Sequence, residues 1–589
     1  MLDKIAILSP NLMGLKQDYP AVLLRDAWLP DCKDIFFQNG TIQKYKKRLL
    51  EFDYQFPDKI LNIEYYFKES ANQWWSVYFT RRDIAYRDIP NKRFVFINKK
   101  YDTGTITVTN NSKIVTGSGT SWNTNAKAGD FIALKDADNT MHSNLVWYEI
   151  DTVDSDTQIT LKVAYEGATE TGKTYFIRKT FTGTDFDYWS ITTFYEKLLA
   201  TNNGIDKIIV WTGTGEVADL TCPYKARSIF TYGNRVILGF LTDIETGDVY
   251  PMGWAWSKLG DETVWGGTGE DAGMDIAIEG TGVITTFTEL RGSLYIFKER
   301  SIIQAWNVET KAVFNKKLIE DGVGTMAPNS VVVEDPYIYY YCPDNTFRQF
   351  NGIKSITISD EISEIIKNLH PDYEKYIQVL EIEIYNQILW AVPYGDSERN
   401  NKLLIYDLDF AHNNWGVADM EVSCIGYYTI EEILDWNSLP FNNWIDWDWP
   451  CWNYIMGLEA FPIDLAGGYD GKIYRLNADV RDVGEDYESY FTLTTDLKNL
   501  KLLPFFKRLL NIRVFAEKEA TGTLKFRIKR DTEATWQEAG EVDLSGDSDI
   551  VIRDLPVDFL ARNFLIEPYS INNFNFLGCV LDYSVIGDR

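Results

Sequence analysis

Short aromatic hairpins recur through the middle of this chain of 589 residues, and they constrain its fold more than any other feature. Each joins two apolar runs across a turn such as Gly-Asn, Gly-Ser or Asp-Gly, residue pairs that favour tight turns. The turns lie about 40 to 60 residues apart, with one interval about twice as long as the one before it. Five such hairpins span residues 229–239, 286–297, 337–350, 381–392 and 465–476.

This spacing is typical of propeller blades, because a sandwich has turns at much shorter intervals and no longer repeat. We predict an irregular β-propeller of about six to eight blades. The alternative is a string of unrelated β-domains, since the hairpins share a pattern and little identity. Composition favours strands throughout, because 15% of the residues are aromatic and such residues prefer sheets. The fold class predicted for the whole chain is therefore all-β.

A chain of this length is too long for one core, and its pattern changes at several points. Short strands between Gly, Asn and Asp turns interrupt the hairpins and predict a small barrel-like insertion. Clean alternation at 524–530 indicates a β-sandwich-like domain at the C-terminal end, and only 362–369 looks helical. The predicted units are an extended N-terminal arm at 1–55, the β-propeller at 56–101 and 181–486, the inserted β domain at 102–180, and the C-terminal β domain at 487–589.

The charge balance argues against a surface that grips nucleic acid. There are 58 basic and 86 acidic residues, which gives a net charge of -28 and repels phosphate on average. The six cysteines are scattered singly, so we expect them to be reduced. The apolar run at the start is shorter than a signal sequence needs, and no run of about eighteen apolar residues follows. We expect folding in a cytoplasm without membrane insertion.

Motifs for nucleotide, metal or acyl chemistry are weak. Residues 167–174 match the spacing of a Walker A motif, but the following 175–181 reads as a strand where the motif needs a helix. We predict a hairpin turn there. His142, His370 and His412 lie far apart without neighbouring ligands, so no metal and no cofactor is expected.

Glycoside hydrolysis is the enzymatic alternative, because aromatic platforms and paired carboxylates are its usual equipment. Asp446 and Asp448 would share one face of a strand, about 7 Å apart. A solvated acidic edge explains the pair equally well in a chain so rich in carboxylates. The expectation is that the chain is not an enzyme, with a carbohydrate-binding or glycan-degrading propeller at the phage or cell surface as the alternative.

Tryptophans gather in one segment late in the predicted propeller, among several aspartates. Indoles that alternate with carboxylates suit a surface that is half buried against something else. They either fill the core between two blades or anchor a neighbouring subunit, since Trp is enriched at the energetic centre of interfaces. The predicted interface residues are Trp436, Trp444, Trp447, Trp449 and Trp452, with Trp415 upstream.

Several segments together resemble tail hub and tail nozzle proteins of short-tailed bacteriophages. The proline-containing arm that leads to 40–48 is similar to the opening of many such proteins. Parts of the insertion resemble a small β module common in phage tails, at 116–122, 128–132, 153–161 and 165–172. Leu-Asp-Trp at 434–436 and Ile-Asp-Trp at 445–447 are similar to Trp-Asp motifs of the same propellers.

The resemblance implies a structural virion protein that is assembled in the host cytoplasm. It would form a ring, as a homohexamer, that continues the DNA channel and takes part in DNA ejection. Its implied partners are further copies of itself, an adaptor or portal-proximal ring, and tail fibres. Double-stranded DNA would pass without specific binding, which a negatively charged wall allows because it offers few phosphate contacts.

Overall fold

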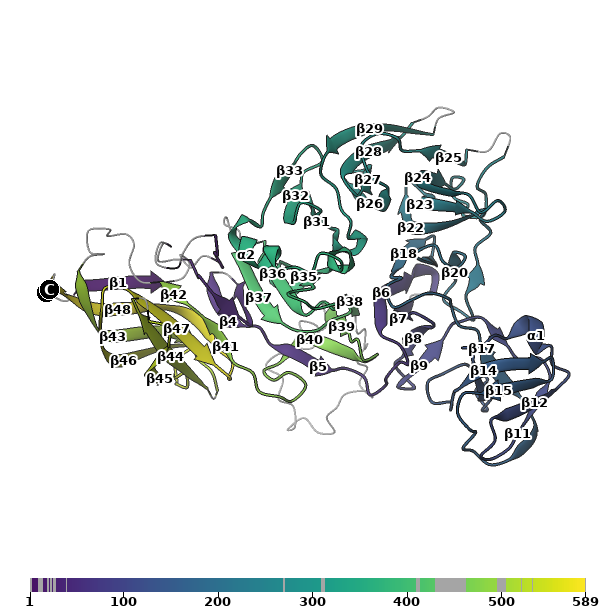
Figure 1. Ribbon diagram of the computed structural model, residues 1–589, viewed down its shortest axis with the longest axis horizontal. Helices are drawn as coiled ribbons and strands as arrows, with labels where there is room; N and C mark the ends of the chain where they lie inside the picture. Colours follow the sequence, from purple (N-terminus) through teal and green to yellow (C-terminus); the bar gives the residue numbers. More distant parts are fainter. Residues whose placement is uncertain are drawn as a thin grey trace.

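The computed structural model is all-β, which confirms the predicted fold class: an irregular β-propeller with an inserted barrel-like domain and a C-terminal sandwich-like domain (Figure 1). The structure describes residues 3–8, 14–18, 21, 24, 28–38, 40–71, 73–267, 271–308, 313–408, 414–428, 462–494, 505–520, 522–531 and 533–587.

Seven blades of four antiparallel strands make up the described part of the propeller, within the predicted number. The first three are β6 (Ile60–Lys68), β7 (Gln73–Thr80), β8 (Ile84–Asp88) and β9 (Arg93–Phe96); β18 (Trp189–Phe194), β19 (Lys197–Asn202), β20 (Ile209–Trp211) and β21 (Ala218–Asp219); and β22 (Tyr224–Tyr232), β23 (Arg235–Asp243), β24 (Val249–Trp256) and β25 (Gly273–Ile276). The fourth and fifth are β26 (Ile284–Leu290), β27 (Ser293–Lys298), β28 (Ser301–Asn307) and β29 (Phe314–Asp321); and β30 (Val332–Glu334), β31 (Tyr337–Cys342), β32 (Thr346–Phe350) and β33 (Ser355–Thr357). The last two are β34 (Gln378–Ile382), β35 (Gln387–Val392), β36 (Lys402–Asp407) and β37 (Asn414–Asp419); and β38 (Cys424–Tyr428), β39 (Ile463–Gly467), β40 (Ile473–Asp479) and β5 (Lys47–Leu50).

The first strands of neighbouring blades contact one another around a closed circle, from β6 through β18, β22, β26, β30, β34 and β38 back to β6. Gly426 allows the last of these contacts, because a Cβ there would stand 2.6 Å from the carbonyl oxygen of Ile63. All five predicted hairpins are present as paired strands. Apolar side chains fill the spaces between blades, as between the first two, where Trp75, Trp189 and Trp211 are buried.

The propeller closes through a strand from the N-terminal region. Strand β5 pairs with β40 and completes the seventh blade, and β6 then begins the first blade. The segment predicted as an extended arm thus contributes strands to the propeller and to the C-terminal domain. Its strands β2 (Cys32–Lys33), β3 (Ile35–Gln38) and β4 (Thr41–Lys44) pair with β41, β37 and β48.

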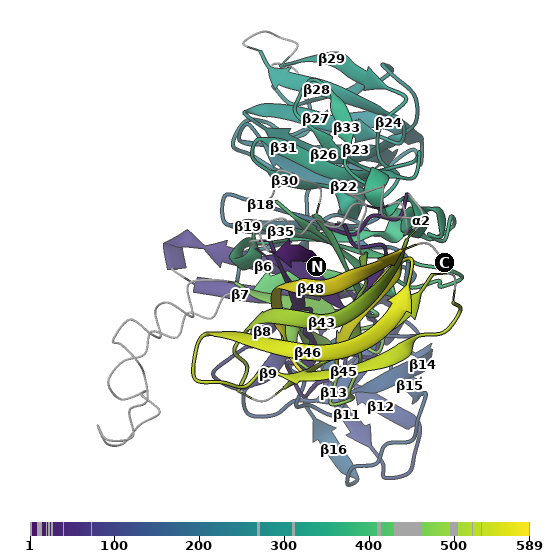
Figure 2. The same cartoon turned by 90° about the vertical axis from the view of Figure 1, so that its left-hand side faces the viewer.

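The C-terminal domain consists of two packed antiparallel sheets, which Figure 2 shows in yellow in front of the propeller. One contains β1 (Asp3–Leu8), β43 (Phe506–Glu517), β46 (Ile550–Ala561) and β48 (Asn575–Gly587). The other contains β41 (Ser489–Phe491), β42 (Leu493–Thr494), β44 (Thr523–Arg530), β45 (Gln537–Asp543) and β47 (Phe564–Ser570). Through β3 and β4 the first sheet continues into the sixth blade, and one apolar core includes Trp390 and Trp415 together with Leu524 and Phe526.

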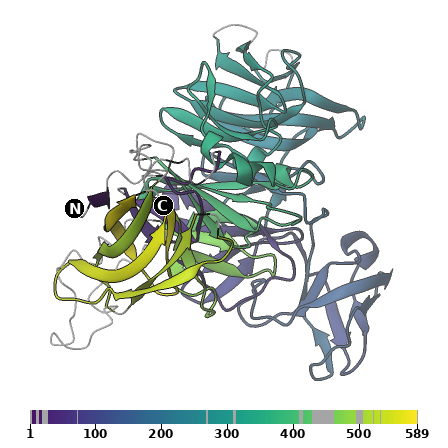
Figure 3. The ribbon, with the colours of Figure 1, turned by 60° about the vertical axis from the view of Figure 1, so that its left-hand side comes forward.

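The inserted domain lies apart from the C-terminal domain, on another side of the propeller (Figures 1 and 3). Its eight strands enclose a separate apolar core around Trp122. Within the Walker-like residues 167–174, Glu170–Lys173 form β16, so no helix begins at Lys173, as the sequence predicts. The predicted hairpin turn is wrong, because β16 pairs with β11 and not with β17. Its elements are β10 (Lys100–Tyr101), β11 (Thr105–Val108), β12 (Ile114–Ser118), α1 (Trp122–Asn125), β13 (Phe131–Leu134), β14 (Tyr148–Ser155), β15 (Gln158–Leu161), β16 (Glu170–Lys173) and β17 (Tyr175–Arg178). The predicted helix at 362–369 is α2 (Ser363–Lys367).

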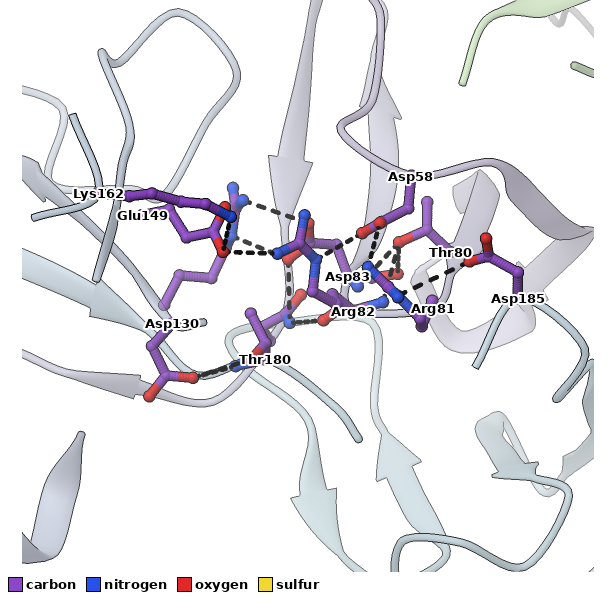
Figure 4. Close-up of polar contacts among 12 residues, drawn as sticks. Asp58, Thr80, Arg81, Arg82, Asp83, Asp130, Glu149, Lys162, Thr180 and Asp185 are labelled. Atoms are coloured by element: carbon purple, nitrogen blue, oxygen red, sulfur yellow. Dashed lines mark hydrogen bonds and ion pairs between the residues drawn. The ribbon is translucent and has the colours of Figure 1, made fainter. Parts of the chain in front are cut away.

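A polar junction fixes the inserted domain to the first blade (Figure 4). Its buried centre is an ion pair in which Arg178 Nε and Nη2 lie 2.9 and 3.2 Å from the carboxylate oxygens of Asp83. The Arg178 guanidinium also covers the ring of Phe96, 3.7 Å from its centroid. Arg82 extends the junction, because it binds Asp58 of the propeller at 2.6 Å and Glu149 of the insertion at 3.4 Å.

Candidate functional site

A cavity of about 450 Å³ lies at one end of the propeller axis. It is bordered by β18, β22 and β26, the first and innermost strands of three blades. We call it the mouth cavity; its wall includes Phe186, Asp187, Tyr188, Arg227, Glu299, Asn329, Lys375 and Tyr376. A second cavity of about 260 Å³ is lined by β6, β34 and β38, and Pro328 and Asn329 border both. The two cavities are therefore neighbours beside the first strands of the blades.

Aromatic rings build one wall of the mouth cavity. The ring of Phe186 is 5.1 Å from that of Tyr376, and Tyr188 lies 5.8 Å from the same ring. The residue Phe186 is 41% exposed, so this ring offers an apolar surface to solvent. Such a flat surface suits the C–H face of a sugar ring, which combines apolar faces with hydroxyl edges.

A buried lysine holds this aromatic wall from behind. Lys59 Nζ stands 5.1 Å from the ring centroids of both Phe186 and Tyr188 and 5.2 Å from that of Tyr469. Lys59 is only 8% exposed, and burial lowers its pKa to about 8. The attraction of the ammonium to three rings fixes the position of the exposed platform.

Charged groups stand beside the aromatic wall. Asp187 accepts hydrogen bonds from the Thr184 N–H at 2.7 Å and from the Asn203 amide at 2.9 Å, which holds its carboxylate in place. The Arg227 guanidinium lies over the ring of Phe240, 3.5 Å from its centroid. Within the described residues it has no hydrogen-bond partner, so its donors are available to a ligand.

Glu299 supplies a second carboxylate to the mouth cavity. Its Oε2 accepts a long hydrogen bond of 3.4 Å from the Val283 N–H. Asp187 and Glu299 therefore come from different loops and face the same space. Paired carboxylates beside an aromatic platform are the groups that glycoside chemistry uses.

The second cavity holds protonatable and unpaired polar groups. Glu64 lines it, and burial raises the pKa of this carboxyl group to about 7. Gln378 is 6% exposed, and its Nε2 has no hydrogen-bond partner in the part of the chain that the structure describes. These side chains give the second cavity both donors and acceptors for a hydroxyl-rich ligand.

The predicted interface residues cannot be placed on this geometry. Trp436, Trp444, Trp447, Trp449 and Trp452 lie outside the described residues, and so do Asp446 and Asp448. Trp415 is described and is fully buried in the core shared with the C-terminal domain. Sequence reasoning missed the mouth cavity, although the run Asp185-Phe-Asp-Tyr-Trp189, aromatic and acidic in alternation, was a local signal for it.

In the described ranges, no three His, Cys, Asp or Glu side chains are grouped to hold a metal ion. His142 instead contacts Asp136, with 2.8 Å between Nε2 and Oδ2. Among the same residues, no helix has both the length and the apolar character needed to cross a membrane.

No family model and no curated protein sequence matches the chain. Among solved structures it is similar to a phage phi92 endosialidase, with 12% identity over 58% of this chain and a TM-score of 0.20. The chain spans 63% of the length of that endosialidase chain. It is also similar to an exo-β-1,3-galactanase from Phanerochaete chrysosporium, with 6% identity over 67% of this chain and 95% of the other, and a TM-score of 0.22. A third is titled a glycoside hydrolase, with 9% identity, 66% and 96% coverage, and a TM-score of 0.20.

One expectation from the sequence is corrected by these comparisons. The chain was expected not to be an enzyme, but the three similar structures bear the names of enzymes. Likenesses of this size carry no particular activity over to the chain. Its function has to be argued from the cavities themselves.

Proposed function

We propose that this protein is a carbohydrate-binding β-propeller protein that acts at a phage or cell surface, and that the glycan occupies the mouth cavity. The observation that carries the proposal is the exposed aromatic platform of Phe186, backed by Lys59 and bordered by charged groups. A sugar stacked on Phe186 would place its hydroxyls near Asp187 and Arg227, which accept and donate respectively.

The proposal is tested by a glycan array, followed by calorimetric titration with the glycan that binds most strongly. Phe186→Ala and Arg227→Gln should each weaken the Kd about tenfold or more, because one removes the platform and the other the unpaired donors. Tyr195→Asn is the matched control, since Tyr195 is an exposed aromatic residue at the other end of the same blade and Asn tolerates its φ of 42°. Equal losses in the control, or no glycan bound on the array, would contradict the proposal.

Cleavage of the bound glycan is measured with the same material. If the cavity hydrolyses its ligand, Glu299→Gln should abolish product formation while Kd changes little, because hydrolysis needs a second carboxylate. Binding without cleavage leaves a lectin-like function in place.

A second candidate function is that of a ring subunit in a phage tail, with further copies, an adaptor ring and fibres as partners. It is favoured by β46, a strand of 12 residues at the end of its sheet, with no strand hydrogen-bonded to its outer edge among the described residues. Ile550 and Ile552 on this strand are 51% and 53% exposed. An unpaired edge strand with exposed apolar side chains can pair with a strand of another chain.

The ring proposal predicts oligomers that light scattering and negative-stain images can detect. Ile552→Lys should dissociate them, because a lysine on an edge opposes further pairing. Val249→Lys, at a 53% exposed position on a propeller blade, is the control. A monomer at high concentration would overturn this candidate and leave the carbohydrate proposal untouched.

A further inference from the structure

A cleft of about 350 Å³ lies between the inserted domain and the second blade, and it collects lysines in an otherwise acidic protein. Lys127 comes from the inserted domain and Lys207 from the blade, while Lys99 and Lys179 come from the two connecting segments. We call it the lysine cleft. It shares no lining residue with the mouth cavity.

The aspartates of the lysine cleft are already engaged by the protein. Asp130, which is 1% exposed, accepts hydrogen bonds from the Thr180 N–H at 2.8 Å and from the Thr180 hydroxyl at 3.0 Å. Asp206 accepts from the Thr182 N–H at 2.7 Å and from the Asn202 amide at 2.8 Å, and Asp219 is paired with Lys99. These bonds hold the carboxylates in place without cancelling their charge, so the four lysines and three aspartates of the lining leave a net charge of +1.

Three of the four lysines form no ion pair within the described residues. Within the described residues, no carboxylate lies within ion-pair distance of Nζ of Lys127, Lys179 or Lys207, and no hydrogen bond from these atoms is formed. The uncompensated charge of the cleft is thus positive. Three ammonium groups around one hollow attract a ligand that carries several oxyanions.

The cleft is held in shape by the junction drawn in Figure 4. Two contacts flank Lys179 in the sequence. Thr180, which follows it, binds Asp130 of the inserted domain, and Arg178, which precedes it, pairs with Asp83. The connecting segments also run side by side, since the Lys179 N–H donates to the Lys99 carbonyl at 2.8 Å. The lysine backbones are therefore positioned before any ligand arrives, which reduces the entropic cost of binding.

We propose that the lysine cleft is a second binding site, which takes an anionic oligosaccharide bearing carboxylate, sulfate or phosphate groups. A saccharide suits the mostly polar wall, where Thr124 and Asn125 add hydroxyl and amide groups. Duplex DNA suits it poorly, because the net charge of -28 repels a long polyanion while a short ligand stays within the positively charged cleft. The site is independent of the function proposed for the mouth cavity.

The test is calorimetric titration of the full chain with tetragalacturonic acid, with its methyl ester as the neutral counterpart. The triple variant Lys127→Gln, Lys179→Gln, Lys207→Gln should weaken the Kd for the acid at least about tenfold. A control triple variant, Lys113→Gln, Lys317→Gln, Lys354→Gln, removes the same charge from exposed positions elsewhere and should change the Kd less than about twofold. Melting temperatures of both variants check that the fold is retained.

Each result decides the proposal. Binding of the acid that weakens with added salt and with the first variant alone supports it. Equal binding of the ester, equal loss in both variants, or no binding of the acid at millimolar concentration overturns it. A 20-base-pair DNA duplex that binds more tightly than the acid and depends on the same lysines would make the cleft a nucleic-acid site and also overturn it.

Discussion

The two domains attached to the propeller are joined to it in different ways. The C-terminal domain continues a blade, because β3 and β4 carry one sheet from β37 to β48 and a single apolar core crosses the boundary. The inserted domain keeps its own core, and its junction with the first blade combines buried ion pairs with a small apolar contact, in which Met141 and Phe176 pack on Phe94 and Phe96. A continuous sheet and a large shared core make the first attachment part of the fold, whereas the second has no shared sheet and adds buried ion pairs to its apolar contact.

The largest expected effect comes from the shared core. Trp390→Ala removes a fully buried indole and should lower the free energy of unfolding by about 3 to 5 kcal/mol. Hydrogen exchange should show the sixth blade and the C-terminal domain losing protection together. Trp122→Ala, the same change in the inserted core, should loosen only Lys100–Arg178. Protection lost in the sixth blade alone would contradict the shared core.

The next effect concerns the junction. Arg178→Ala leaves Asp83 buried without its partner and should cost about 3 to 5 kcal/mol, with faster exchange in the inserted domain and the first blade. Replacing both partners, Arg178→Met with Asp83→Asn, should cost clearly less, because no charge is then left unpaired. Urea denaturation compares the two. If the double variant is as unstable as the single one, the ion pair does not control the attachment.

A third effect lies inside the propeller and depends on pH. Burial raises the pKa of Glu64 to about 7, above its ordinary value of 4.5, so the folded protein keeps a proton that the unfolded chain loses. Stability from this group is fully present below about pH 4.5 and falls as pH rises to about 7. Glu64→Gln should flatten this part of the curve of urea midpoint against pH. Glu289→Gln, at an exposed position, should leave the curve unchanged.

The smallest expected effect is on the surface of the C-terminal domain. Arg508 and Asp558 form a bidentate pair at 2.5 Å, but both side chains are exposed. Solvent screens such a pair, so Arg508→Ala should not measurably move the urea midpoint. A shift as large as that of Arg178→Ala would show that ion pairs matter equally in both attached domains.

The sequence predicts those parts of the molecule that depend on neighbouring residues. The hairpins at 229–239 and 465–476 combine aromatic strands with turn residues, and both signals are local. The pairing of β5 with β40 is not predictable in this way, because the partners stand at opposite ends of the propeller sequence. Residues 47–50 therefore look like part of an arm when read alone.

The residues of the candidate sites are likewise predictable only where they are neighbours in the sequence. Phe186 and Asp187 stand in a conspicuous run, but Arg227, Glu299 and Tyr376 join them only through the circular arrangement of the blades. The lysines of the cleft are likewise far apart in sequence, and single lysines in a polar chain carry no signal. The tryptophan segment is the reverse case, since its density is evident from the sequence while its interface role stays a prediction.

The closing strand β5 also sets an order of events during synthesis. It is made near the start of translation, and its partner β40 emerges only after every other blade has left the ribosome. Until then one edge of the nascent ring stays open, and a contact of such long sequence separation forms slowly. If translation stops within the seventh blade, the released chain has an open propeller whose exposed strand edge favours aggregation. Correct folding therefore depends on completing translation through this region.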